Sequence, residues 1–400
     1  MSKFSFNIFA IWFLALPFTV ITSYYFGVIA IDKILAPALL ILWASLLPFG
    51  YYRLTPGKLS ILFIAFCFFL IRNISFIDNT ALFYSLLWED AVHFGYFCLP
   101  ILYINNLNNI KTSGKLISVN ATIGCVSAFM VAIGLLTLPY ERFSQSRIGF
   151  DIQKSIGLFS SYGDLAQYAA CFIVMAIFAP SMLISAKRQK TLLVITAFII
   201  IIMGLIGNQS RSYFLSLIVA VFLSALFYYF SGKRINRILF NLSFAGIGIG
   251  TVSLVAYLFT DIVKLLSSLG GSQAEATAHG RLKQYQMAFD FIREYPVMGV
   301  DSAVFSKHSE YIQGIHNMWL GQLSLGGFVS AFILAGLMLQ IFNTASKLLY
   351  NPQVKEYAIM SIGYIFATLT ATLFYPADTS LFWALLGMNA AIIYTLRTVR

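Results

Sequence analysis

Residues Thr191 to Phe230 read TLLVITAFIIIIMGLIGNQSRSYFLSLIVAVFLSALFYYF and form two apolar runs, at 191–206 and 212–230. A single charged residue, Arg211, stands between the two runs. An apolar run of about 17 to 25 residues is long enough to cross a bilayer as a helix. The sequence here therefore predicts two membrane-spanning helices that are joined by a short turn.

The composition of the whole chain agrees with a membrane protein. Of its 400 residues, 59% are hydrophobic and 10% are charged, and the mean hydropathy is +0.82. A soluble surface carries roughly 25% charged residues, so a cytosolic enzyme is excluded. The net charge of +11 then reports how basic residues are distributed about the bilayer, and nucleic-acid binding is not expected.

Apolar runs bounded by charges or turn-forming residues predict about twelve transmembrane helices, hence an all-α polytopic fold. The third is short, and Glu89, Asp90 and His93 interrupt the fourth, so a re-entrant segment over 72–95 is an alternative. The predicted spans are 7–28, 34–52, 59–71, 81–104, 116–138, 165–186, 191–206, 212–230, 238–260, 317–343, 357–374 and 381–396.

The distribution of lysine and arginine predicts the orientation of these spans, because basic residues accumulate in cytoplasmic loops. With both termini cytoplasmic, the inner side receives 15 of the 26 basic residues and only one of the 15 acids, Glu356. A wrong number of spans would scramble this segregation. We therefore expect a multi-pass protein of the bacterial inner membrane with both termini in the cytoplasm.

Two long outer loops, 139–164 and 261–316, hold most of the polar sequence. They divide the chain into N-terminal spans at 1–138, central spans with the first periplasmic loop at 139–260, the large periplasmic loop at 261–316, and C-terminal spans at 317–400. Because the predicted inner loops are short and basic, we expect the function to reside on the outer face.

The large loop contains an amphipathic segment, 279–295, with apolar residues at helical spacing. Pro296 and Gly299 follow it, and both favour the end of a helix. One interpretation is a helix that only lies on the membrane surface. The other is a helix that covers a cavity and presents Arg281 to it.

Several polar residues at the predicted outer ends of spans are candidates for binding a substrate. His316 and Asn317 lie at the outer mouth of the span predicted at 317–343. Arg211 lies in a turn between two spans, where a cation is costly unless it snorkels to headgroups or binds an anion. Arg147 and Arg281 could join Arg211 in holding a phosphate or diphosphate, with Asp378 to balance or orient one of them. No pair of histidines and no acidic cluster has metal-ligand spacing, so no metal and no cofactor are expected.

The pattern R-x-x-x-Y-x-x-A-x-x-x-I-x-x-x-P-x-x-G from Arg281 to Gly299, followed by His316, Asn317 and a span containing L-G-G, resembles the O-antigen ligase and O-antigen polymerase superfamily. An R-x-G and a G-L-F between 147 and 159, and Q-S-R-S at 209–212, are also similar. The turn at 162–164 departs from the asparagine-rich sequence that relatives often have there.

The resemblance implies a metal-independent glycosyltransferase with no cofactor. The donor would be a glycan linked through diphosphate to undecaprenol, at the periplasmic face of the membrane. The acceptor would be the glycan of another lipid-linked unit in a polymerase, or a sugar of the lipid A core in a ligase. A chain-length regulator is a further partner that a polymerase would have. The resemblance also implies His316, Arg281 and Arg211 as catalytic residues and Arg147, Asn317 and Asp378 as substrate-binding residues.

Polymerisation of O-antigen repeat units is the favoured function, and ligation to the lipid A core is the alternative. A polysaccharide transporter or flippase is the alternative from another class, because twelve spans with both ends inside are also typical of transporters. The halves of the chain show no repeat, and polar residues concentrate in outer loops, which favours the transferase.

Overall fold

A computed structural model describes residues 3–18, 31–46, 54–138, 155, 157–159, 161–184, 189–208, 210–231, 272–313, 315, 317–373 and 379–398. Within these ranges every regular element is a helix, as the sequence predicts. The elements are α1 (Lys3–Ala15), η1 (Leu16–Phe18), α3 (Ile31–Leu46), α4 (Pro56–Arg72), η3 (Ile74–Phe76), α5 (Thr80–Tyr103), α6 (Leu107–Ala132), α7 (Tyr162–Phe178), η4 (Pro180–Met182), α8 (Lys190–Asn208), α9 (Arg211–Phe230), α11 (Ser272–Glu294), α12 (Ser302–Gln313), α13 (Met318–Leu348), α14 (Lys355–Thr372) and α15 (Ser380–Leu396).

Five of the described helical segments are long and apolar enough to cross a membrane by length and composition. They are Pro56–Phe76, Leu107–Ala132, Lys190–Asn208, Tyr213–Phe230 and Met318–Leu348. Shorter apolar helices occur at Ser5–Phe18, Ile34–Ser45, Gly163–Phe178 and Ser380–Leu396. A polytopic membrane protein is thus the fold class. Each predicted span overlaps a described helix except 238–260, which lies outside the described residues, as does the part of the first predicted span from 19 to 28.

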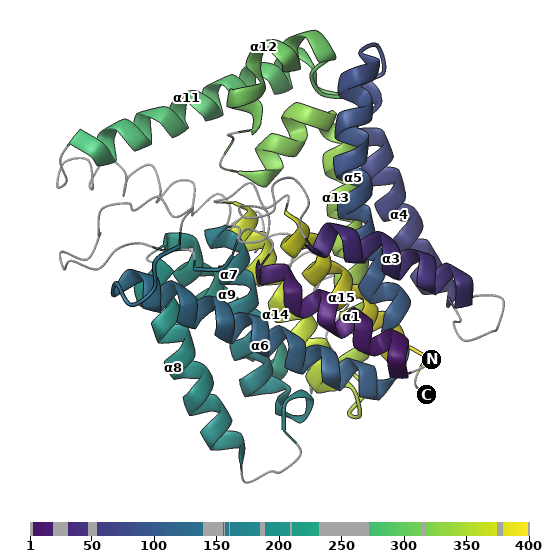
Figure 1. Ribbon diagram of the computed structural model, residues 1–400, viewed down its shortest axis with the longest axis vertical. Coiled ribbons are helices and arrows are strands. Elements are labelled where there is room, and N and C mark those ends of the chain that lie inside the picture. The colour runs from purple at the N-terminus through teal and green to yellow at the C-terminus, as the bar shows by residue number, and fades with distance from the viewer. Residues whose placement is uncertain are drawn as a thin grey trace.

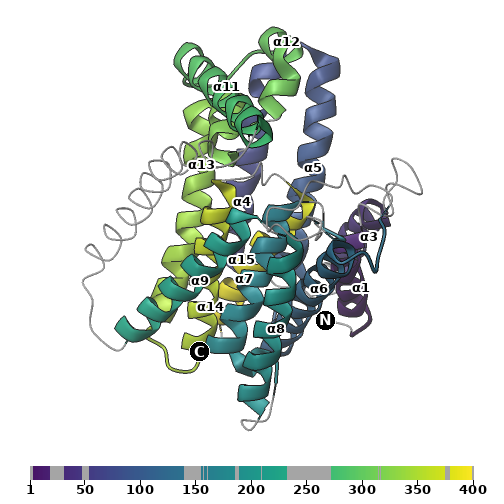
Figure 2. The same ribbon diagram turned by 90° about the vertical axis from the view of Figure 1, so that its left-hand side faces the viewer.

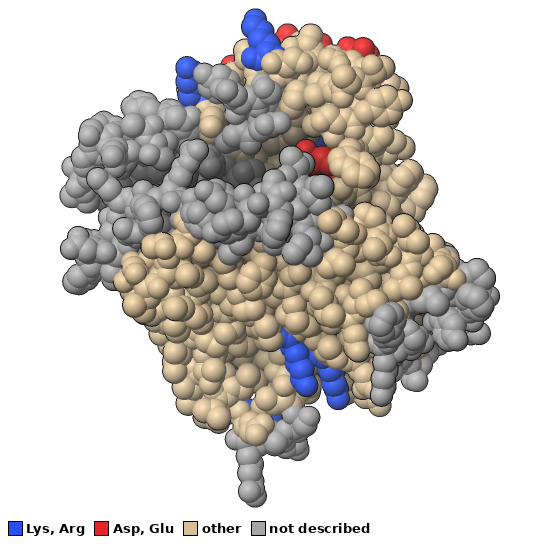
Figure 3. Space-filling model, viewed as in Figure 1, with Lys and Arg blue, Asp and Glu red and all other residues tan. Residues whose placement is uncertain are grey.

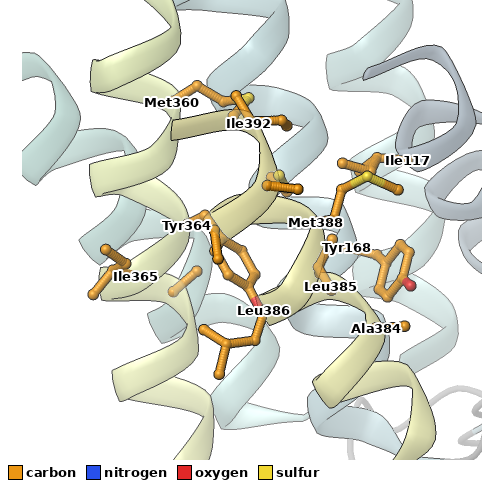
Figure 4. Packing of buried hydrophobic residues seen from close by; sticks show 14 of the residues in the cluster. Ile117, Tyr168, Met360, Tyr364, Ile365, Ala384, Leu385, Leu386, Met388 and Ile392 are labelled. Atoms are coloured by element: carbon orange, nitrogen blue, oxygen red, sulfur yellow. The ribbon is translucent and has the colours of Figure 1, made fainter. Parts of the chain in front are cut away.

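Helices α14 and α15 form the centre of the bundle (Figure 1). Every residue of α15 from Leu381 to Leu396 is buried, because α15 packs on α5 along one side and on other helices around it. Gly387 permits this close approach, since a side chain there would overlap the carbonyl of Phe97. The large side chain of Tyr364 from α14 packs beside α15 in the same core (Figure 4).

Helices α11 and α12, with the turn 295–301 between them, lie over one end of the bundle and are called the cap (Figures 1 and 2). A second apolar cluster of Phe76, Phe291, Val300 and Phe305 holds the cap to the hairpin of α4 and α5. The Ser302 hydroxyl also donates to the Asp78 carboxylate at 2.9 Å. Both chain termini lie toward the other end of the bundle (Figures 1 and 2), which we call the opposite end.

Both boundaries of α6 differ from the sequence prediction, each for a local reason. Helix α6 begins at Leu107 instead of 116, because the Asn106 side chain caps it by accepting from the Asn109 amide at 2.9 Å. It ends at Ala132 instead of 138, and Gly134 follows with φ of 77°. Helix α5 runs unbroken through its charged residues, which favours one continuous helix over a re-entrant segment.

The opposite ends of three helices meet at Lys58, which is 2% exposed. Its ammonium donates to the carbonyls of Ile101 and Ile104 at 3.1 and 2.5 Å and to the Asn105 side chain at 2.8 Å. The Thr395 hydroxyl from α15 donates to the same Ile104 carbonyl at 2.7 Å. The last carbonyls of α5 therefore find donors from α4 and α15, in place of the helical amides that a helix end lacks.

Candidate functional site

Two glycine-containing motifs, P-x-x-G at 296–299 and L-G-G at 325–327, lie next to each other in the structure. The turn after α11 pairs with the kink in α13: Val300 donates its amide to the Ser324 carbonyl at 2.9 Å, and Phe328 donates to the Pro296 carbonyl at 2.8 Å. Gly299 and Gly327 lie at the centre of this contact with φ of 79° and 61°. The P-x-x-G and L-G-G sequences therefore join the cap to a long apolar helix through their backbones.

Gly327→Ala is expected to lower the free energy of unfolding by about 1–3 kcal/mol, because its φ and ψ of 61° and −166° suit only glycine. A Cβ at this position would also overlap the Val297 carbonyl. Thermal unfolding of the detergent-solubilised protein measures the effect. Gly321→Ala is the control on the same helix, since a Cβ there meets nothing within 4 Å. Equal unfolding temperatures for the two variants would contradict a close backbone contact.

A buried ion pair lies directly beside this contact. Arg72 ends α4 and binds Asp90 of α5 through two of its nitrogens, Nε at 3.0 Å and Nη2. The Asn73 amide donates to the same carboxylate at 2.6 Å. Asp90 is 0% exposed and Arg72 is 7% exposed. A Cβ on Gly326 would lie 3.4 Å from the Arg72 Cα, so the end of α4 that carries this ion pair lies next to the kink in α13.

A second polar group ties together the cap ends of α7 and α15. Asp164, which is 1% exposed, accepts from the Ser161 hydroxyl at 2.8 Å and from the Thr379 hydroxyl at 2.7 Å. Asn317 lies at the start of α13, where its side chain accepts from the Leu320 amide at 3.0 Å and donates to the Leu373 carbonyl at 3.2 Å. The cap ends of α7, α13, α14 and α15 thus form a polar layer beneath the cap.

The turn before α9 is also held in place. Ser210 caps α9 by accepting from the Tyr213 amide at 3.2 Å. The Tyr213 hydroxyl donates to the Ile201 carbonyl of α8 at 3.2 Å. A Cβ on Gly207 would overlap the Ala128 carbonyl of α6. The beginning of α9, at which Arg211 stands, is therefore fixed against α6 and α8.

The structure describes only some of the predicted site residues. Arg211 begins α9 and Arg281 lies in α11, and Figures 1 and 2 show α11 above the cap ends of α7 and α9. The side chains of these two arginines, and all of Arg147, His316 and Asp378, lie outside the described residues. Asn317 is described and acts as a helix cap, so the convergence of these residues on one substrate stays a prediction.

Sequence reasoning did not single out Asp164, or Arg72 and Asp90 as a pair. A signal existed for the pair, since an arginine at the end of an apolar run and an aspartate within the next one both need a partner in a membrane. Asp164 had a weaker signal, a serine three residues ahead of a carboxylate at the start of an apolar run. Among the described residues, no group of three histidine, cysteine, aspartate or glutamate side chains could hold a metal ion.

Comparison with known proteins shows that part of the chain is similar to a known family. Residues 195–335 match the family described as O-antigen ligase. The matched region runs from α8 to α13 and contains Arg211, Arg281, His316, Asn317 and both glycine motifs. No curated protein matches the chain. This match supports the resemblance to the O-antigen ligase and polymerase superfamily that the sequence shows, over residues 195–335.

Proposed function

We propose that the protein is a glycosyltransferase that polymerises O-antigen repeat units, taking the growing glycan from undecaprenyl diphosphate. The observation that carries this proposal is the match of residues 195–335 to the O-antigen ligase family. The family supports a function of the ligase or polymerase type, with a lipid-linked glycan and an acceptor as substrates within a membrane. Helix α11, the glycine contact and the part of α13 up to residue 335 lie inside the match.

The proposed reaction is a displacement at the anomeric carbon of the donor sugar. An acceptor hydroxyl forms the new glycosidic bond, and the bond from that carbon to the diphosphate oxygen breaks. The oxygen leaves with the electron pair as undecaprenyl diphosphate. His316 accepts the hydroxyl proton as general base, which requires a pKa near neutrality.

Arginines supply the electrostatic part of this proposal. Arg211 and Arg281 hold the diphosphate, whose charge rises as the bond breaks, and Arg147 adds a third guanidinium. Asn317 and Asp378 orient the acceptor or one of the arginines. With these cations the leaving group needs no metal ion, so the proposed enzyme has no cofactor.

The proposed topology has about twelve spans, both termini in the cytoplasm and the cap in the periplasm. The surface of the described residues supports it: in Figure 3 charged side chains gather over the cap and near the opposite end, and the surface between them is largely uncharged. A band of uncharged surface between two charged ends is expected of a protein that spans a bilayer, because charged side chains are costly in the hydrocarbon core. We further propose that the protein resides in the bacterial inner membrane.

Deleting the gene is expected to leave lipopolysaccharide whose core carries a single repeat unit, because the ligase remains and polymerisation is lost. Gel electrophoresis of lipopolysaccharide from the deletion strain measures this directly. Restoration of the ladder by the wild-type gene on a plasmid is the control.

The ligase is the second candidate, because ligase is the printed description of the matching family. A core free of any O-antigen after deletion would identify a ligase. Unchanged lipopolysaccharide would exclude both functions.

A further inference from the structure

A cavity of about 380 Å³ lies among α4, α13 and α15, on the far side of the bundle from the cap. Its walls come from the first turns of α4, the last three turns of α13 and the end of α15. Figures 1 and 2 show the C-terminus at this opposite end. The cavity is thus remote from the glycine contact and from the polar layer beneath the cap.

Two cations lie in the lining of this cavity. Lys347 comes from the last turn of α13, and Arg397 follows the end of α15; both are exposed. Among the residues that the structure describes, no acidic residue lines the cavity. The one ion pair found within the described residues joins Arg72 to Asp90, so neither Lys347 nor Arg397 is neutralised by a described carboxylate. The cavity therefore favours an anion.

Helix α13 is long and apolar enough to span a membrane, but the side chains that it contributes to the cavity lining include a row of polar residues. Gln340, Asn343 and Lys347 share a face because they lie three or four residues apart. The Gln340 amide donates to the Ser60 hydroxyl at 3.2 Å. Polar residues in an apolar span are costly and mark a binding role by default.

The part of the cavity beside Gly336 and Leu339 is apolar and open. Leu339 is 44% exposed, and a Cβ on Gly336 would meet nothing within 4 Å. Gly336 lies eleven residues before Lys347, about 16 Å along the helix. A ligand that fills the cavity thus needs an anionic head at Lys347 and Arg397 and a hydrocarbon part beside Gly336. A free phosphate ion lacks the second part.

We propose that this cavity binds the headgroup of an anionic phospholipid, with its phosphodiester between Lys347 and Arg397 and an acyl chain beside Gly336. Basic pockets between transmembrane helices bind such headgroups in other membrane proteins. Gly57 brings the backbone of α4 close to the head end of the cavity, since a Cβ there would lie 2.7 Å from the Tyr394 ring and 3.7 Å from the Arg397 guanidinium. This binding does not depend on the glycan transfer proposed above.

Native mass spectrometry of the purified, full-length protein with added phosphatidylglycerol tests the site. The wild-type protein is expected to retain this lipid in preference to phosphatidylcholine. The K347Q/R397Q variant is expected to retain at least about tenfold less of it, because both cations are lost. K111Q/K115Q is the control, since it removes two exposed lysines from α6 without touching the cavity.

Gly336→Leu tests the hydrocarbon part, because leucine favours a helix and would occupy the open space while both cations remain. Reduced lipid retention by this variant is expected. Wild-type retention by K347Q/R397Q would overturn the proposal, as would equal binding of phosphatidylcholine. Displacement of the lipid by millimolar inorganic phosphate would show a small-anion site, and would also overturn it. Size-exclusion elution confirms that each variant is folded.

Discussion

Asp90→Leu is expected to destabilise the protein by about 3–5 kcal/mol, because it removes the carboxylate that compensates a buried guanidinium. Arg72 is 7% exposed and binds Asp90 through both Nε and Nη2. Asn73 also loses its 2.6 Å contact with the carboxylate. Thermal unfolding of the detergent-solubilised protein, by intrinsic fluorescence, measures the loss.

Two further variants show whether the pair itself is the cause. Glu89→Leu makes the same chemical change one residue earlier on α5, at an exposed side chain, and should leave stability nearly unchanged. The double variant Arg72→Met, Asp90→Leu removes both charges together and should recover most of the loss, since an apolar pair leaves no charge without compensation. A double variant as unstable as Asp90→Leu would contradict this account.

His316→Ala is expected to abolish glycan transfer, with a loss of about 10²–10⁴-fold for a missing general base. Arg281→Ala is expected to reduce transfer by about 10²–10³-fold, because the proposed mechanism loses one donor to the leaving diphosphate. Both residues belong to the region that matches the O-antigen ligase family. Restoration of the lipopolysaccharide ladder in the deletion strain, and transfer by purified protein, are the two measurements.

The cap offers a matched control for each of these residues. His308 lies in α12, where its ring is 5.6 Å from that of Phe291, and Arg293 is an exposed residue in the last turn of α11. Alanine at either position should leave transfer intact if the loss is specific. Full activity in His316→Ala or in Arg281→Ala would remove that residue from the mechanism, even with the family assignment unchanged.

Hydropathy was sufficient to predict helices where the apolar run is long and its ends are charged or polar. The two runs between Thr191 and Phe230 became α8 and α9 nearly residue for residue. Hydropathy failed where a local hydrogen bond sets the boundary, as at Asn106, which caps α6 within a polar sequence. It also missed α12, whose few apolar residues bury against the α4–α5 hairpin and not in a span.

The amphipathic helix was predicted from its spacing and from Pro296 and Gly299, and α11 ends at Glu294 as expected. Its attachment was not predictable, because it depends on Gly327, 28 residues after Gly299, taking a backbone conformation open only to glycine. The pairing of Arg72 with Asp90 depends in the same way on the register of two antiparallel helices. Of the candidate site residues, the structure describes the side chain of Asn317 alone.

The position of α15 has a consequence for the order in which the chain can mature during synthesis. Helix α5 is made early, but its buried half is covered by α15, and Thr395 caps the Ile104 carbonyl from 291 residues away. Contacts of such long range form only after the intervening chain exists. Until α15 has been synthesised, α5 and the other early helices therefore form an intermediate in which the buried half of α5 is not yet packed against α15.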